Sequence, residues 1–200
     1  ENMIRSEVKE GKIELKAACD GVFLVDSARL VAVNSQDEVM IATRKGGMAV
    51  REGDKLAGMR VIPLVIEEEK LQRAETAAGK EPLLALRPFV RKTACIVATG
   101  SEVKKGLIQD TFTPVVIDKL KTYGIETLEV VYSGDGVENV RDAVLAMRER
   151  NPDMVLCTGG MSVDPDDNTP SGIRAAGADI VCYGAPVLPG AMFLLGYFDD

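Results

Sequence analysis

The stretch DMVLCTGGMSVDPDDNTP, residues 153–170, decides the expected fold, because it joins a short apolar run to a polar glycine loop and then to a helix start. The run at 153–157 has the length and composition of a buried β-strand. Thr169 and Pro170 suit the opening of a helix that ends at Gly177. The succession of strand, loop and helix is the repeating unit of a parallel sheet.

Similar units surround this stretch. Further strands are predicted at TACIVA (93–98), LEVVY (128–132), ADIVCYG (178–184) and AMFLLGYF (191–198). Helices are predicted at about 114–123, capped by Thr113, and at about 136–150, where Asp135 and Glu138 have the spacing of a capping box. Residues 91–200 are therefore expected to form an α/β domain with three layers, α/β/α, in which helices cover both faces of a mostly parallel sheet.

The first ninety residues have a different pattern. Short apolar runs separated by turns (KIELKAA, FLV, RLVAV and EVMIAT) predict a smaller β-rich unit at 1–90. One helix is expected at 67–78, with Gly79 at its C-terminal stop. The segment EPLLALRPFVRK at 81–92 is predicted to be a linker or a boundary strand. Because the chain stops directly after an apolar run, we expect the second domain to be truncated at its C-terminus.

Three polar loops follow the first three predicted strands of the second domain. They are TGSEVKKG (99–106), SGDG (133–136) and TGGMSVDPDD (158–167). The carboxyl ends of parallel strands share one edge of the sheet, and open α/β sheets bind ligands at that edge. We therefore expect the three loops to lie side by side and to form a ligand site.

The third loop predicts a phosphorylated ligand that arrives with a divalent cation. The glycine pair at 159–160 can turn successive amides toward an anion, beside the hydroxyls of Thr158 and Ser162. The acids that follow would repel an anion by themselves, whereas Mg²⁺ binds few carboxylates and is completed by phosphate oxygens. Asp166 and Asp167 are the predicted metal ligands. The alternative is that the glycines only make a tight turn and that the acids only solvate the loop.

Four more residues near this edge have both a structural and a functional interpretation. Ser101 offers a donor or caps a helix, and Glu102 offers a carboxylate that would face Asp166 and Asp167 across the edge. Asp110 is either a turn or cap residue or a second contact to metal or ligand. Asp135 is either a helix cap or a ligand contact.

Composition excludes several classes of function. A net charge of -7 and a pI near 4.8 disfavour binding to nucleic acid or to an anionic membrane surface. The absence of histidine excludes His-dependent catalytic triads. No apolar stretch reaches the length of a membrane span or forms a signal peptide, which predicts a cytoplasmic protein. The four cysteines lack paired metal-ligand spacing, and Cys95, Cys157 and Cys182 are expected to be reduced thiols in buried strands.

The order of these loops resembles the molybdopterin-binding domain of molybdenum cofactor biosynthesis proteins. The resemblance covers about residues 93–200 and rests on TGSE, GLIQD at 106–110, SGDGVENV, and TGG followed by DDNTP. It implies a domain that holds molybdopterin by its phosphate, and an enzyme that either adenylates molybdopterin with ATP and Mg²⁺ or inserts molybdate. It also implies a homo-oligomer, a dimer or a trimer, and it makes the N-terminal unit an accessory domain.

The resemblance assigns roles to the predicted site residues. Glu102, Asp110 and Asp167 would hold metal or polarise the reacting group. The residues expected to bind the ligand are Thr99, Gly100, Ser101, Asp135, Thr158, Gly159, Gly160, Met161 and Ser162. The chain departs from the family pattern at Ser101, at Phe112, and at Ala191 with Met192, and these departures bear on turnover more than on binding. Two alternatives are a non-catalytic carrier or sensor of the cofactor and a nicotinamide-nucleotide amidohydrolase-related domain of the same fold.

Overall fold

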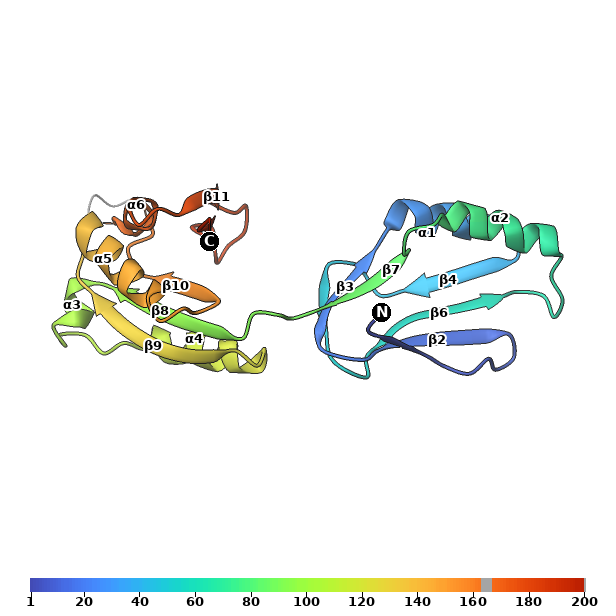
Figure 1. The fold of residues 1–200 in the computed structure, drawn as a ribbon, viewed down its shortest axis with the longest axis horizontal. Coiled ribbons are helices and arrows are strands. Elements are labelled where there is room, and N and C mark those ends of the chain that lie inside the picture. The colour runs from blue at the N-terminus through green and yellow to red at the C-terminus, as the bar shows by residue number, and fades with distance from the viewer. Residues whose placement is uncertain (163–166, 200) are drawn as a thin grey trace. The chain divides into compact units, whose positions relative to one another are not determined.

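The computed structural model describes residues 1–162 and 167–199. The chain divides into two compact units, Glu1–Val90 and Arg91–Asp200, which are called unit 1 and unit 2 below (Figure 1). Within the described ranges, no helix has the length and apolar character needed to cross a bilayer.

Unit 1 contains two antiparallel sheets that share one apolar core. The larger sheet has the order β1-β2-β6-β4, from β1 (Met3–Arg5), β2 (Lys12–Ala17), β6 (Lys55–Val61) and β4 (Val39–Thr43). The smaller has the order β5-β3-β7, from β5 (Met48–Val50), β3 (Gly21–Val25) and β7 (Leu84–Pro88). The core side chains Phe23, Leu56 and Leu86 come from both sheets, so the sheets bury each other's inner faces.

Two helices complete unit 1, α1 (Ser27–Asn34) and α2 (Glu68–Ala78). The predicted helix at 67–78 is confirmed, and Gly79 ends it with a φ of 73°. The interpretation of RLVAV as a strand-like run was wrong, because these residues lie in α1. The carboxylate of Asp26 accepts the Arg29 amide at 3.0 Å and caps this helix, and a short apolar run cannot by itself distinguish strand from helix. The segment at 81–92 contains β7, which pairs with β3.

Unit 2 is built on a parallel sheet of three strands in the order β10-β8-β9. The strands are β8 (Thr93–Thr99), β9 (Glu126–Ser133) and β10 (Met154–Thr158). The central strand β8 is buried on both faces, which explains its unbroken apolar sequence. All three strands run in the same direction, so their carboxyl ends meet at one edge.

Helices cover both faces of this sheet, which confirms the predicted three-layer α/β/α domain (Figure 1). Cys95 and Val97 of β8 pack against α5 (Val137–Arg148) and α6 (Thr169–Ala175). Ala94 and Ile96 of the same strand pack on the opposite face against α4 (Phe112–Thr122). The stripe predicted on the helix at 136–150 supplies three buried side chains, Val140, Val144 and Met147.

The C-terminal part of unit 2 differs from the expectation. The strands β11 (Asp179–Tyr183) and β12 (Leu194–Tyr197) pair with each other antiparallel and form a separate two-stranded sheet. Every residue of β11 except the half-buried Ile180 is exposed, so this strand is not a fourth buried strand, and Cys182 is an exposed thiol. All four cysteines are free. Burial raises the pKa of Cys157 to about 12, which makes this thiol unreactive.

Candidate ligand site

The site lies at the carboxyl edge of the parallel sheet. Thr99 at the end of β8 is in register with Ser133 at the end of β9, and Thr158 of β10 is paired with the neighbouring Ala98. The amide of Gly100 donates to the carbonyl of Ser133 at 3.1 Å. The predicted convergence of the three loops is therefore confirmed.

A buried pair of threonines ties the third loop to the first. The hydroxyl of Thr99 donates to the carbonyl of Thr158 at 2.9 Å and lies 3.1 Å from the hydroxyl of Thr169, which opens α6. The Thr169 hydroxyl in turn donates to the carbonyl of Gly159 at 2.9 Å. The Thr169 amide donates to the carbonyl of Gly160 at 3.0 Å. The glycine turn is thus held from both sides by residues that lie at least nine positions away in the chain.

The two glycines are required by close approach as well as by conformation. Gly159 and Gly160 have φ values of 84° and 57°. A Cβ atom on Gly159 would lie 2.3 Å from the carbonyl oxygen of Thr99, and one on Gly160 would lie 2.6 Å from the Thr169 hydroxyl. A side chain at either position would force the loop away from β8.

Ser101 and Asp135 connect the first loop to the second. The amide of Ser101, the first residue of α3 (Ser101–Lys104), donates to the Asp135 carboxylate at 3.0 Å. The Asp135 amide donates to the Ser101 hydroxyl at 3.3 Å. The hydrogen bonds from Ser101, first that of its side chain and then that of its amide, hold the pKa of Asp135 below its usual value.

The capping box predicted for Asp135 and Glu138 was wrong. Helix α5 has Gly136 at its N-cap and no side-chain cap, because the Asp135 carboxylate is directed to Ser101 of another element. The predicted capping of α4 by Thr113 was also wrong: the helix begins at Phe112, and Thr113 is buried within its first turn.

Asp110 performs the structural role that the sequence left open. One of its oxygens accepts the amides of Phe112 and Thr113 at 2.9 and 3.0 Å, so the carboxylate caps α4. Burial raises the pKa of Asp110, but hydrogen bonds from Thr113 and Phe112 outweigh it and leave the pKa below its usual value. Burial and the neighbouring Asp110 together raise the pKa of Tyr132 at the end of β9.

The remaining predicted residues lie along the same edge with different exposure. Glu102 is exposed on α3, Met161 is half-buried and Ser162 is exposed. Asp167 is half-buried and directly precedes Asn168, the N-cap of α6. Asp166 lies outside the described residues. No group of three or more Cys, Asp or Glu side chains within the described ranges could hold a metal ion.

Two residues that position the loop were missed as site residues. Thr169 was expected only to open a helix, although its place in the DDNTP motif directly after the glycine loop was a usable signal. The hydroxyl of Tyr183 in β11 donates to the carbonyl of Met161 at 2.9 Å. No sequence signal links Tyr183 to this loop, because the contact depends on where the β11–β12 hairpin folds.

Comparison with known proteins defines the class of this site. Residues 95–196 match the family described as "Probable molybdopterin binding domain", which is more than half of the 200-residue chain. The chain belongs to this molybdopterin-binding domain family, and the resemblance inferred from the loops is confirmed. The match covers unit 2, including all of the loops described above.

Individual relatives differ in how much of the chain they cover. A CinA-like protein of Mycobacterium tuberculosis is 32% identical over 80 residues, which is 40% of this chain and 19% of that protein. The solved structure of the protein CinA from Thermoplasma acidophilum is 24% identical, covers 44% of this chain and 54% of its own, and has a TM-score of 0.42. The solved structure of the molybdopterin biosynthesis MoeA protein from Pyrococcus horikosii is 14% identical to this chain. The alignment covers 99% of this chain and 64% of the MoeA chain, with a TM-score of 0.46.

Proposed function

We propose that the carboxyl edge of the unit 2 sheet binds molybdopterin through its phosphate, as a step in molybdenum cofactor biosynthesis. The observation that carries this proposal is the glycine turn at 159–160, which Thr99 and Thr169 hold in place in a chain of the molybdopterin-binding domain family. Successive backbone amides in a turn that contains left-handed residues can form a concavity that favours anions. The hydroxyl of Ser162, exposed beside the turn, would add a donor to the same phosphate.

The acids at this edge suit a cation that is shared with the ligand. Mg²⁺ takes one or two carboxylates and fills its remaining positions with water and phosphate oxygens. Asp167 would supply such a carboxylate, and the absence of a three-acid cluster among the described side chains is compatible with a metal that arrives with the ligand. When bound, the metal would neutralise phosphate charge beside the acidic loop.

The bound ligand could then be adenylated with ATP or receive molybdate, or it could only be carried. Glu102 and Asp110 are the remaining candidate groups for polarising a reacting atom. Asp110 already accepts two amides, so its carboxylate is a positioned acceptor. Formation of adenylated product from molybdopterin, ATP and Mg²⁺ would support the enzyme, whereas binding without product would leave the non-catalytic carrier.

The proposed site is tested by the replacement of one acid. Asp167→Asn should weaken Mg²⁺-dependent binding of molybdopterin by at least about tenfold, because a carboxylate ligand is lost. Isothermal titration calorimetry with and without Mg²⁺ measures this. Asp179→Asn is the control, because Asp179 is exposed at the start of β11. Equal effects of the two substitutions would contradict the site.

The same titration should also compare molybdopterin with a second candidate ligand, nicotinamide mononucleotide. The TGSE and TGG loops also resemble those of nicotinamide-nucleotide amidohydrolase-related domains, which share this fold. Nicotinamide mononucleotide offers a phosphate without the pterin dithiolene. Tighter binding of this nucleotide than of molybdopterin would favour the alternative function.

A further inference from the structure

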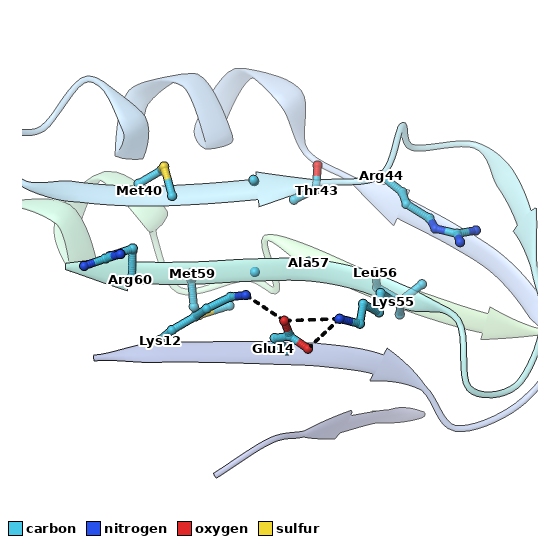
Figure 2. A pocket seen from close by; sticks show the side chains of 12 residues that line it. Lys12, Glu14, Met40, Thr43, Arg44, Lys55, Leu56, Ala57, Met59 and Arg60 are labelled. Carbon is cyan, nitrogen blue, oxygen red and sulfur yellow. Dashed lines mark hydrogen bonds and ion pairs between the residues drawn. The ribbon is translucent and has the colours of Figure 1, made fainter. Parts of the chain in front are cut away.

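Unit 1 carries a groove on the open face of its larger sheet, far along the chain from the loops of unit 2. The groove has a volume of about 410 Å³ and is lined by residues of β2, β4 and β6 (Figure 2). This volume lies within the range of about 300–1,000 Å³ that small-molecule sites occupy. The proposed function of unit 2 makes no use of it.

The groove is open above its floor because the small residues Gly58 and Ala42 lie side by side on neighbouring strands. Gly58 of β6 is in register with Glu14 of β2 on one side and with Ala42 of β4 on the other. A Cβ atom added to Gly58 would meet only Lys12 Cε, at 3.7 Å. The space above Gly58 is therefore open, and the exposed side chain of Met40 in β4 supplies apolar lining at its side.

The rim of the groove is positively charged, although the whole chain carries a net charge of -7. Its charged lining consists of Lys12, Arg44, Lys55, Arg60 and a single carboxylate, Glu14. Figure 2 shows Glu14 at the centre, in contact with Lys12 at 2.7 Å and with Lys55 at 3.2 Å. The carboxylate holds both ammonium groups over the groove, and hydrogen bonds from Lys12 and Lys55 lower the pKa of Glu14.

Arg60 is the cation that remains available. It stands in register with Lys12 and Met40, at the opposite end of β6 from Lys55. Its Nε donates to the carbonyl of Val61 at 3.2 Å, and it forms no ion pair with a carboxylate of the described residues. An anion in the groove would therefore find a guanidinium that no carboxylate in the described part of the chain neutralises.

We infer that this groove binds a small aromatic or heteroaromatic molecule that carries an anionic group. The flat apolar floor over Gly58 and Ala42 accepts the ring, and the surplus of cations accepts the charge. The limited volume of about 410 Å³ favours a small molecule over a folded partner.

Two dyes that differ only in their charged group test the inference. 1-Anilinonaphthalene-8-sulfonate should bind the intact chain at one saturable site, and its uncharged analogue N-phenyl-1-naphthylamine should bind more weakly. Fluorescence titration measures both affinities. Arg60→Gln should weaken sulfonate binding about fivefold, because one rim charge near the sulfonate is lost, and added salt should weaken it in the native chain.

Filling the groove provides the decisive variant. Gly58→Val places two methyl groups in the open space, in a strand position that favours β-branched residues, and should abolish the saturable binding of the sulfonate dye. Ala49→Val is the matched control, because Ala49 is exposed on β5 of the other sheet. Circular dichroism verifies that both variants are folded.

Retained binding of the sulfonate dye by folded Gly58→Val, or equal affinity of the native chain for the two dyes, would overturn the inference. Displacement of the dye by poly-glutamate would also overturn it, in favour of an acidic peptide as the occupant.

Discussion

At the scale of single residues, Thr169 connects the glycine turn to the rest of unit 2. Its side chain is 1% exposed, and its hydroxyl lies between Thr99 and the carbonyl of Gly159. When a buried carbonyl loses its hydrogen-bond donor, the folded state is destabilised by the full desolvation penalty of that carbonyl. The contribution of Thr169 is therefore a hydrogen bond and not only a packed methyl group.

Thr169→Val should lower the free energy of unfolding of unit 2 by about 1–3 kcal/mol, because it keeps the shape of the side chain and removes the donor. Thr169→Ser, which retains the hydroxyl, should cost less. Urea denaturation followed by tyrosine fluorescence measures both. A larger loss for the serine variant than for the valine variant would show that the methyl group is the more important part.

Asp153 predicts a dependence of stability on pH. Its carboxylate accepts the amides of Lys92 and Thr93 and the hydroxyl of Thr93 at 2.7, 2.9 and 3.0 Å, joining the start of β10 to the start of β8. The Lys92 amide first, and then the Thr93 donors, lower the pKa of Asp153. A carboxyl with a lowered pKa in the folded state stabilises the fold above its unfolded pKa of about 4.

This stabilisation should disappear as the pH falls below about 4 and through the lowered pKa of the folded state. Asp153→Asn should therefore lower the melting temperature at neutral pH and make it fall less steeply in acid. Thermal melts between about pH 7 and about pH 2 test this. The control is Asp118→Asn, whose side chain is 76% exposed. Parallel pH profiles of native chain and Asp153→Asn would refute the role of Asp153.

At the scale of elements, helices α5 and α6 of unit 2 pack closely at Gly172. A Cβ atom on Gly172 of α6 would lie 2.5 Å from Cβ of Val140 in α5 and 3.1 Å from the carbonyl of Val137. The sequence shows Gly172 only as a weak position within a short helix. Its necessity follows from helix packing, which depends on the neighbouring element.

Gly172→Ala should destabilise unit 2 by about 1–3 kcal/mol, because the added methyl group overpacks the contact and outweighs the higher helix propensity of alanine. Val140→Ala should also destabilise, by leaving a cavity. The double variant should be more stable than the sum of the two effects predicts, because each change relieves the other. If urea denaturation showed that the two changes in the free energy of unfolding add strictly, Gly172 and Val140 would not be coupled, and the proposed close packing of α5 on α6 would be contradicted.

At the scale of the whole molecule, each unit has its own core. Phe23, which is completely buried, lies in the core of unit 1, and Val97 lies in a core of unit 2. The chain has no tryptophan, and its four tyrosines, Tyr123, Tyr132, Tyr183 and Tyr197, all belong to unit 2. Tyrosine fluorescence therefore reports the unfolding of unit 2 alone, whereas far-ultraviolet circular dichroism reports both units.

Phe23→Ala should destabilise unit 1 by about 3–5 kcal/mol. The unfolding transition seen by circular dichroism should then broaden or split, while the tyrosine fluorescence midpoint should stay in place. Val97→Ala should shift the fluorescence midpoint instead. If Phe23→Ala moved both signals together, the two units would unfold as one cooperative body.

The sequence by itself determined the features that are local in the chain. The strand at 93–98 was predictable because a strand that is buried on both faces must be continuously apolar. The strand at 153–157 was predictable from its short apolar run, although it lies at the edge of the sheet and is half-buried. The glycine turn at 159–160 was predictable because few other residues adopt its conformation. The convergence of the loops followed from the parallel direction of the strands, which brings their carboxyl ends together.

Only the tertiary structure decided which distant groups complete these features. The hydrogen bonds of Thr169 and the Ser101–Asp135 contact join segments tens of residues apart, and the pairing of β11 with β12 removes them from the main sheet. The groove over Gly58 exists because the register of three strands places Glu14, Gly58 and Ala42 in one row. Strand register and helix packing are set by the burial of whole faces of the elements. They depend on contacts between elements, so the sequence of any single segment does not determine them.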